Sequence, residues 1–185
     1  MHIVVVYESM FGNTRQVAEA IADSIRPVHS VWCQPVGSAD PTIVSTADLL
    51  IIGAPTHAWS LSRPTTRQGA ADQASEPDSH KQLEPDATGI GLREWLERED
   101  PLPSRAAVFD TRRNISPLLS GRAGRAIKHL LHQHGVKVVA GPVSFLVDAD
   151  NQLVPGELER AASWGREITA HIEPLVLRGH RDDLL

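Results

Sequence analysis

The segment His2–Tyr7 is built on an unbroken run of β-branched residues, Ile3–Val6, and a helical pattern follows it after a short loop. Because no polar residue alternates within the run, the strand that it predicts must be covered on both faces. Val17, Ile21 and Ile25 then recur at four-residue steps, which is typical of an amphipathic helix. A doubly covered strand that leads directly into a helix is the repeating unit of a parallel sheet.

The same alternation continues along the chain and predicts four more strands: Val28–Val36, Asp48–Gly53, Ala106–Asp110 and Val136–Val147. A helix is predicted at Gly91–Arg98. A second begins at the Ser116-Pro117 cap, with the apolar stripe Leu119, Ala123, Ile127, Leu130 and Leu131 and a stop at Gly135. A third follows Pro155, with Leu158, Ala161, Gly165, Ile168 and Ile172 on one face. Five strands alternating with helices imply right-handed crossovers and a three-layer α/β sandwich.

Length and composition agree with one folded domain. The chain has 185 residues, of which 41% are hydrophobic and 22% charged, so it can bury a substantial core. Its only cysteine, Cys33, excludes a disulfide scaffold, and the net charge of −5 argues against a broad nucleic-acid-binding surface. No apolar run approaches the length of a membrane span, and the N-terminus lacks a signal-peptide pattern. We therefore expect a cytoplasmic protein without a membrane span.

Two segments fit the compact unit poorly. Between Thr65 and Thr88 the only large aliphatic residue is Leu83, which favours a flexible insertion, with an ordered lid as the alternative. Residues 176–185 are expected to form a C-terminal tail. The predicted organisation is a single domain over residues 1–175.

The loop after the first strand has the residues of an anion site. In an open α/β sheet, ligands bind at the carboxyl ends of the strands. Here Glu8–Thr14 leads from a buried strand into a helix, and Gly12 permits a tight turn. The amides of Met10–Thr14 and the hydroxyls of Ser9 and Thr14 favour a phosphate at the helix N-terminus. The loop has no lysine, which excludes a nucleoside-triphosphate P-loop, whereas a capped helix start without a ligand stays an alternative.

The spacing Ser9-x-Phe11-Gly12-Asn13-Thr14 resembles the phosphate-binding loop of the flavodoxin family, Ser/Thr-x-Thr-Gly-x-Thr. The resemblance extends over nearly the whole chain outside Thr65–Thr88, and it departs at Phe11, where a hydroxyl residue is usual. It implies a five-stranded parallel sheet of order 2-1-3-4-5 and FMN as the cofactor. The strings Phe-Asp-Thr-Arg and Gly-Leu-Arg-Glu-Trp-Leu look like those of actinobacterial flavodoxin-family proteins.

By this resemblance, the loop after the third strand lies against the isoalloxazine ring. Trp59 or His57 would stack on the ring, and the backbone from Thr56 to Ala58, following Pro55, would meet its N5 edge. Alternatively, Trp59 only covers the end of the sheet. Flavodoxins commonly carry glycine or asparagine where Ala58 stands, so strong stabilisation of one-electron-reduced flavin is not expected.

The loop after the fourth strand would meet the pyrimidine side of the ring. Backbone amides near Asp110 and the hydroxyl of Thr111 are candidates to bind it, and Arg112 or Arg113 would favour an anionic reduced flavin. The alternative is that both arginines are solvated. A second stacking tyrosine is absent from this loop, since the only tyrosine is Tyr7, so one face of the ring is expected to be open.

The resulting hypothesis is an FMN-binding redox protein in which the flavin performs the chemistry and no side chain is catalytic. The alternatives are an FMN-dependent NAD(P)H:quinone-type oxidoreductase and a flavin-free scaffold. The expected partners are a redox protein, or NAD(P)H and a small electron acceptor, with no nucleic acid. His129 and His132 belong to a basic strip on the helix after Pro117, which we interpret as a solvated face rather than a metal site.

Overall fold

The computed structural model describes residues 1–57, 59–76, 79, 81–98 and 101–182, with side chains as far as residue 172. Its centre is a five-stranded parallel sheet in the order β2-β1-β3-β4-β5. The strands are β1 (His2–Tyr7), β2 (Ser30–Pro35), β3 (Leu49–Pro55), β4 (Arg105–Arg113) and β5 (Lys137–Val147). The predicted fold class and strand order are therefore confirmed.

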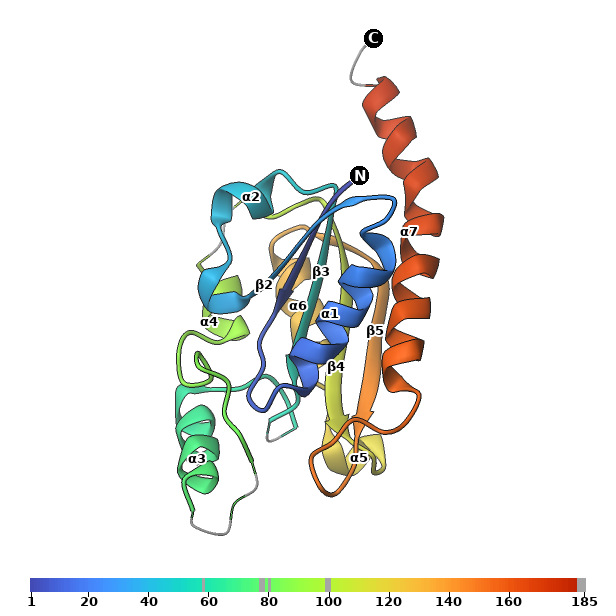
Figure 1. Ribbon diagram of the computed structural model, residues 1–185. Coiled ribbons are helices and arrows are strands. Elements are labelled where there is room, and N and C mark those ends of the chain that lie inside the picture. The colour runs from blue at the N-terminus through green and yellow to red at the C-terminus, as the bar shows by residue number, and fades with distance from the viewer. Residues whose placement is uncertain (58, 77–78, 80, 99–100, 183–185) are drawn as a thin grey trace.

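Helices cover both faces of this sheet (Figure 1). They are α1 (Asn13–Ile25), α2 (Pro41–Ser45), α3 (Pro64–Ala74), α4 (Leu92–Leu96), α5 (Pro117–Ser120), α6 (Ala123–Gln133) and α7 (Glu157–Asp182), with a short 3-10 turn at Val36–Ser38. None in the described part of the chain is long and apolar enough to cross a membrane.

The two faces of the sheet form separate cores because side chains alternate along each strand. Ile3 and Val5 of β1 pack with α1 and α7, whereas Val4 and Val6 pack with α4 and α6. All four side chains are buried, as the uninterrupted apolar run predicts. The close approach of α1 and α7, in which a Cβ at Gly165 would lie 3.2 Å from Ile21, fixes the helix that begins at the phosphate-loop sequence.

The single helix expected after Pro117 is instead two helices. Gly121, with φ +73°, ends α5, and α6 starts two residues later. Leu119 is 67% exposed and does not join the stripe that continues from Ala123, so its predicted place in the core is wrong. The glycine turns the chain before the helical period can carry Leu119 inward. In α7, Leu158 is also partly exposed (38%).

The two segments that fitted the compact unit poorly contain helix. Residues 64–74 form α3, which the sequence analysis did not predict, and Ala87 is buried. The flexibility expected for residues 65–88 stays a prediction, and positions 77, 78 and 80 lie outside the described residues. At the C-terminus, α7 extends to Asp182, so residues 176–182 are helical, and their assignment as a tail outside the domain stays a prediction.

Candidate functional site

A cavity of about 510 Å³ lies at the carboxyl ends of β1, β3 and β4, where the three predicted loops meet. This volume is in the range of small-molecule sites. Nine of the residues predicted from sequence line it: Met10, Phe11, Asn13, Thr14, Pro55, Thr56, His57, Thr111 and Arg112. Ser9, Gly12, Trp59 and Asp110 do not line it, and Ala58 lies outside the described residues.

The loop after β1 presents a set of free backbone amides. Gly12 adopts φ +85°, a left-handed conformation that favours glycine, and α1 begins at the next residue. Within the described chain, no acceptor binds the amides of residues 10–14, and the first turn of α1 contains no acidic side chain. Ser9 is buried just below, where its Oγ accepts from the Arg15 amide at 3.3 Å. Unpaired amides at the N-terminus of a 13-residue helix favour an anion.

Two threonine hydroxyls join this loop to β4. Thr14 Oγ1 and Thr111 Oγ1 are 2.8 Å apart and buried, and both residues line the cavity. On the other side, Asn13 Nδ2 donates to the carbonyl of Asn151 at 3.0 Å. The loop is thus fixed by contacts from two distant parts of the chain, which lowers the conformational cost of binding a ligand there.

The loop after β3 is a tight turn in which the amides of His57 and Ser60 each donate to the carbonyl of the other. His57 lines the cavity, and burial, together with the nearby charge of Arg67, lowers the pKa of its imidazole. Trp59 occupies the tip with φ +68° and is 66% exposed, so its side chain covers neither the core nor the wall of this cavity. The alternative that it covers the sheet end as a core residue is therefore wrong.

The end of β4 differs from the loop expected there, because the strand continues to Arg113. Asp110 is fully buried in the strand, where its Oδ2 accepts from the Gly124 amide at 2.7 Å and burial raises its pKa. The Arg112 side chain is fixed by nearby backbone groups, since its Nη1 donates to the carbonyls of Ile115 (2.8 Å) and Arg113 (3.0 Å). The alternative of a freely solvated Arg112 is wrong, whereas Arg113 is exposed.

The far wall of the cavity was missed by the sequence analysis. One face of α3 supplies most of it, through Thr66, Gly69, Ala70 and Gln73. Three residues from other parts of the chain complete it: Lys81, Val147 and Asn151. The one local signal for this helix was Pro64 at its first position, because α3 has little apolar periodicity. The helix could not be recognised from apolar spacing, because an ion pair, rather than an apolar face, fixes it to the rest of the molecule.

A buried polar network holds α3. Arg67 is 3% exposed, and its Nη1 donates to Ser62 Oγ at 2.9 Å while Nη2 pairs with Glu94 Oε2 at 3.0 Å. Nearby, buried Glu8 accepts from the Leu92 amide at 2.8 Å. Burial raises the pKa of Glu8, and the charge of Arg67 opposes that shift. The network links the end of β1 to both α3 and α4.

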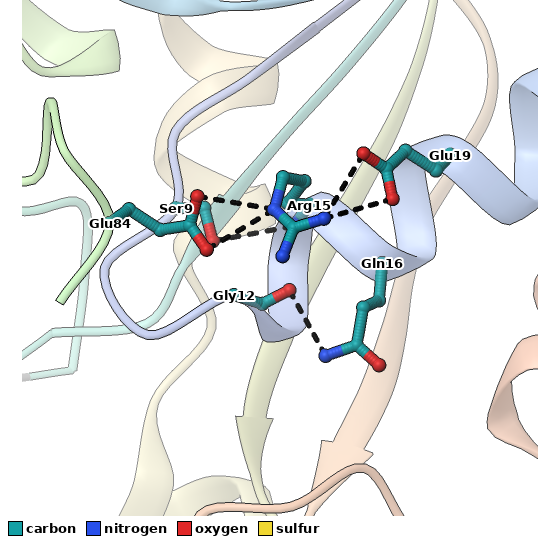
Figure 2. A network of polar contacts seen from close by, with 6 residues as sticks. All are labelled: Ser9, Gly12, Arg15, Gln16, Glu19 and Glu84. Atoms are coloured by element: carbon teal, nitrogen blue, oxygen red, sulfur yellow. Dashed lines mark hydrogen bonds and ion pairs between the residues drawn. The ribbon is translucent and has the colours of Figure 1, made fainter. Parts of the chain in front are cut away.

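A second network lies on the surface at the start of α1 (Figure 2). The Arg15 guanidinium pairs with Glu84 and Glu19, both at 3.1 Å, and the Glu84 amide donates to the carbonyl of Met10 at 3.0 Å. Residues 81–85 therefore pass beside the amide-rich loop. They also border a larger hollow of about 1170 Å³, which shares Phe11, Gln73, Lys81 and Asn151 with the first cavity.

Comparisons with known proteins agree with this geometry. A family model described as a flavodoxin domain matches residues 4–67. A flavodoxin from the domain Archaea superposes with a TM-score of 0.63 at 17% identity, covering 94% of this chain and 99% of its own. The Streptococcus pneumoniae TIGR4 flavodoxin gives 0.61 at 16% identity, with 92% and 99% covered. A flavodoxin, WrbA-like protein from Agrobacterium tumefaciens gives 0.56 at 20% identity, with 94% and 98% covered.

No curated protein sequence matches the chain. The family match includes β1, the amide-rich loop, α1 and β3, which supply two of the three loops at the cavity. The structural likeness extends well beyond the family match, to 94% of the chain for the archaeal flavodoxin. A flavodoxin-domain model thus matches the N-terminal third of the chain, and the superposition with the archaeal flavodoxin, over 94% of the chain, shows a flavodoxin-like fold.

Proposed function

We propose that this protein is an FMN-binding redox protein that passes electrons through the flavin to a partner. The observation that carries the proposal is the group of free amides at residues 10–14, next to the buried hydroxyls of Thr14 and Thr111. Such a donor set fits a phosphate ester, which needs several N–H and O–H donors, and the one carboxylate described beside Gly12, that of Glu84, is paired with Arg15.

The phosphate would be held by Ser9, Gly12, Asn13 and Thr14, with the amides of Met10 and Phe11. The ring would occupy the rest of the cavity, between His57 and the end of β4. Bound flavin supplies reversible one- and two-electron transfer. The residues of this chain orient it and exclude water.

Electrostatics at the cavity favour electron-rich flavin. Arg112 lines the cavity with its Nη1 bound to carbonyls, so its positive charge is fixed in place. Burial and the neighbouring charge of Arg122 lower the pKa of Arg112. A nearby negative charge would therefore stabilise the charged form of the Arg112 guanidinium. His57 is biased toward its neutral form. A fixed cation beside the ring stabilises added negative charge there.

A second candidate is an FMN-dependent reductase that takes hydride from NAD(P)H. The observation in its favour is the wall formed by α3, where Gly69 and Ala70 face the cavity and leave room beside a bound ring. Electron transfer to a protein partner remains our first choice, because the archaeal and Streptococcus pneumoniae structures that superpose on this chain are flavodoxins.

The proposal is tested by titrating the flavin-free protein with FMN and following flavin fluorescence. Replacing Ser9 and Thr14 together by alanine should weaken FMN binding at least about tenfold, since a hydrogen bond to a charged group contributes ~1.5–3 kcal/mol. The control is Thr42→Ala with Ser45→Ala, two hydroxyls on α2 away from the cavity. Circular dichroism checks that each variant folds.

Equal affinity of the wild type and the Ser9/Thr14 variant would place the phosphate elsewhere. Failure of the wild type to bind FMN at millimolar concentration would overturn the proposal and leave the flavin-free scaffold. If FMN binds, rapid anaerobic bleaching by NAD(P)H would favour the reductase over the electron carrier.

A further inference from the structure

Large hydrophobic side chains gather on the surface at one end of the molecule. In the described part of the chain seven such residues are exposed, and four of them are Trp59, Ile115, Leu118 and Leu119. They come from two segments that touch, because the Arg122 amide donates to the carbonyl of Trp59 at 3.3 Å and Gly121 bridges to Trp59. We call these four residues the apolar patch. Its exposure is high, with Leu118 at 90%.

The apolar patch lies beside the proposed flavin site. Figure 1 shows α5, which carries both leucines, at the ends of β4 and β5. Arg112 joins the two features, since it lines the cavity and donates to the carbonyl of Ile115 and to Ser120 Oγ. His57, also in the cavity wall, is two residues from Trp59. A protein that covered the patch would reach the rim of the cavity.

Basic side chains predominate next to the apolar patch. Between Thr111 and Ala126, the stretch that contains α5 and the start of α6, the chain has four arginines and no Asp or Glu, although the whole chain carries −5. Arg113 and Arg125 are exposed next to α5 and at the start of α6. At the same end, the turn after β5 carries Asp148 and Asp150, and Asp148 Oδ1 accepts from two backbone amides.

We propose that the apolar patch and its basic rim form the docking surface for an acidic electron-transfer protein with an apolar centre. That the partner carries electrons rests on the proposed function, whereas its acidity rests on the charges of the rim. An apolar centre within a charged rim is the usual anatomy of a transient interface. A second copy of this chain fits less well, since a two-fold contact would bring Arg113 and Arg125 toward their own copies.

The test measures binding directly and needs no flavin. The chain is titrated by isothermal calorimetry with a plant-type [2Fe–2S] ferredoxin as an acidic probe, and with a basic cytochrome c for comparison. We expect the ferredoxin to bind more tightly than the cytochrome at low ionic strength, and the affinity to fall as salt is added. Leu118→Ser and Arg125→Glu should each weaken ferredoxin binding about tenfold.

Two variants serve as matched controls, Leu158→Ser and Arg166→Glu, which make the same chemical changes at exposed positions of α7. Each should change the affinity less than twofold. The proposal is overturned by equal effects of patch and control variants, by absence of ferredoxin binding at millimolar concentration, or by a dimer in sedimentation that Leu118→Ser dissociates. FMN retention is recorded separately, so the loss of one proposal does not imply the loss of the other.

Discussion

Two polar networks hold the segment between residues 63 and 94 against the rest of the molecule, and they differ mainly in burial. In the network around Arg67 the arginine itself is buried, with that side chain 4% exposed and its partner Glu94 20% exposed. The network around Arg15 is on the surface, where the arginine is 37% exposed and Glu84 17%. Both have ion-pair distances close to 3 Å. Distance alone would rank them as equals.

Burial separates their energetic roles. An exposed pair is screened by solvent and contributes little, whereas breaking a buried pair leaves a charge that water cannot reach. We therefore expect α3 to be fixed firmly by Arg67, and residues 81–85 to be held weakly by Glu84. The two edges of the same segment then differ in how readily they open over the cavity.

The largest effect is expected for Arg67→Met, which keeps the apolar bulk and removes the charge. It leaves Glu94 and Glu8 without their buried cation, so the free energy of unfolding should fall by ~3–5 kcal/mol. Urea unfolding followed by circular dichroism measures this. Arg63→Met, at an exposed position next to the same helix, is the control and should change stability by less than ~0.5 kcal/mol.

The double variant Arg67→Met with Glu94→Gln sharpens the test, because it removes both members of the pair. Part of the lost stability should return, since the double variant no longer buries an uncompensated Glu94 carboxylate. Strictly additive losses would show that Arg67 acts by packing rather than by charge.

A second effect is a dependence of stability on pH. Burial raises the pKa of Glu8 in the folded protein, so the folded state binds more protons than the unfolded state above the ordinary pKa of glutamate. Stability should therefore fall as the pH rises from the ordinary pKa of glutamate to the raised, folded value. In Glu8→Gln this fall should be reduced. Urea midpoints across this range for both proteins measure the difference, and parallel curves would contradict the assignment.

The smallest effect on stability is expected for Glu84→Gln, at most ~1 kcal/mol and less at high salt. Hydrogen exchange should nevertheless show faster opening of residues 81–85 in this variant. Glu19→Gln is the control, because it removes the other partner of Arg15 and leaves Glu84 in place. If both variants open this segment equally, the pair with Glu84 does not hold it.

The sheet could be predicted because its signals are local. The run Ile3–Val6 and the repeat Val17, Ile21 and Ile25 each specify one element, and the alternation of such elements limits the topology. The break at Gly121 was missed, since a glycine within an apolar helical period reads as a tolerated interruption. In the structure, the positive φ of Gly121 ends the first helix and separates it from the second.

The candidate site likewise has a part that could be predicted from local sequence and a part that could not. The loop Ser9–Thr14 was predictable because one short stretch supplies both the turn and the donors. The wall formed by α3 was not predictable, because the helix is held by interactions of Arg67 with Glu94 and Glu8, which are distant in sequence. For Trp59 the exposed position rules out only the alternative of a core residue at the sheet end, and its stacking on a flavin ring stays a prediction.

Gly121 has a consequence for how such a protein can diverge. Because the helix breaks there, α5 can change its surface without disturbing α6, whose residues fill the core. By the proposals above, substitutions within Ile115–Ser120 would change the docking surface, whereas substitutions in Ser9–Thr14 would change the phosphate site. Under the two proposals made above, separate stretches of sequence would govern partner recognition and ligand binding, so that each could change without the other.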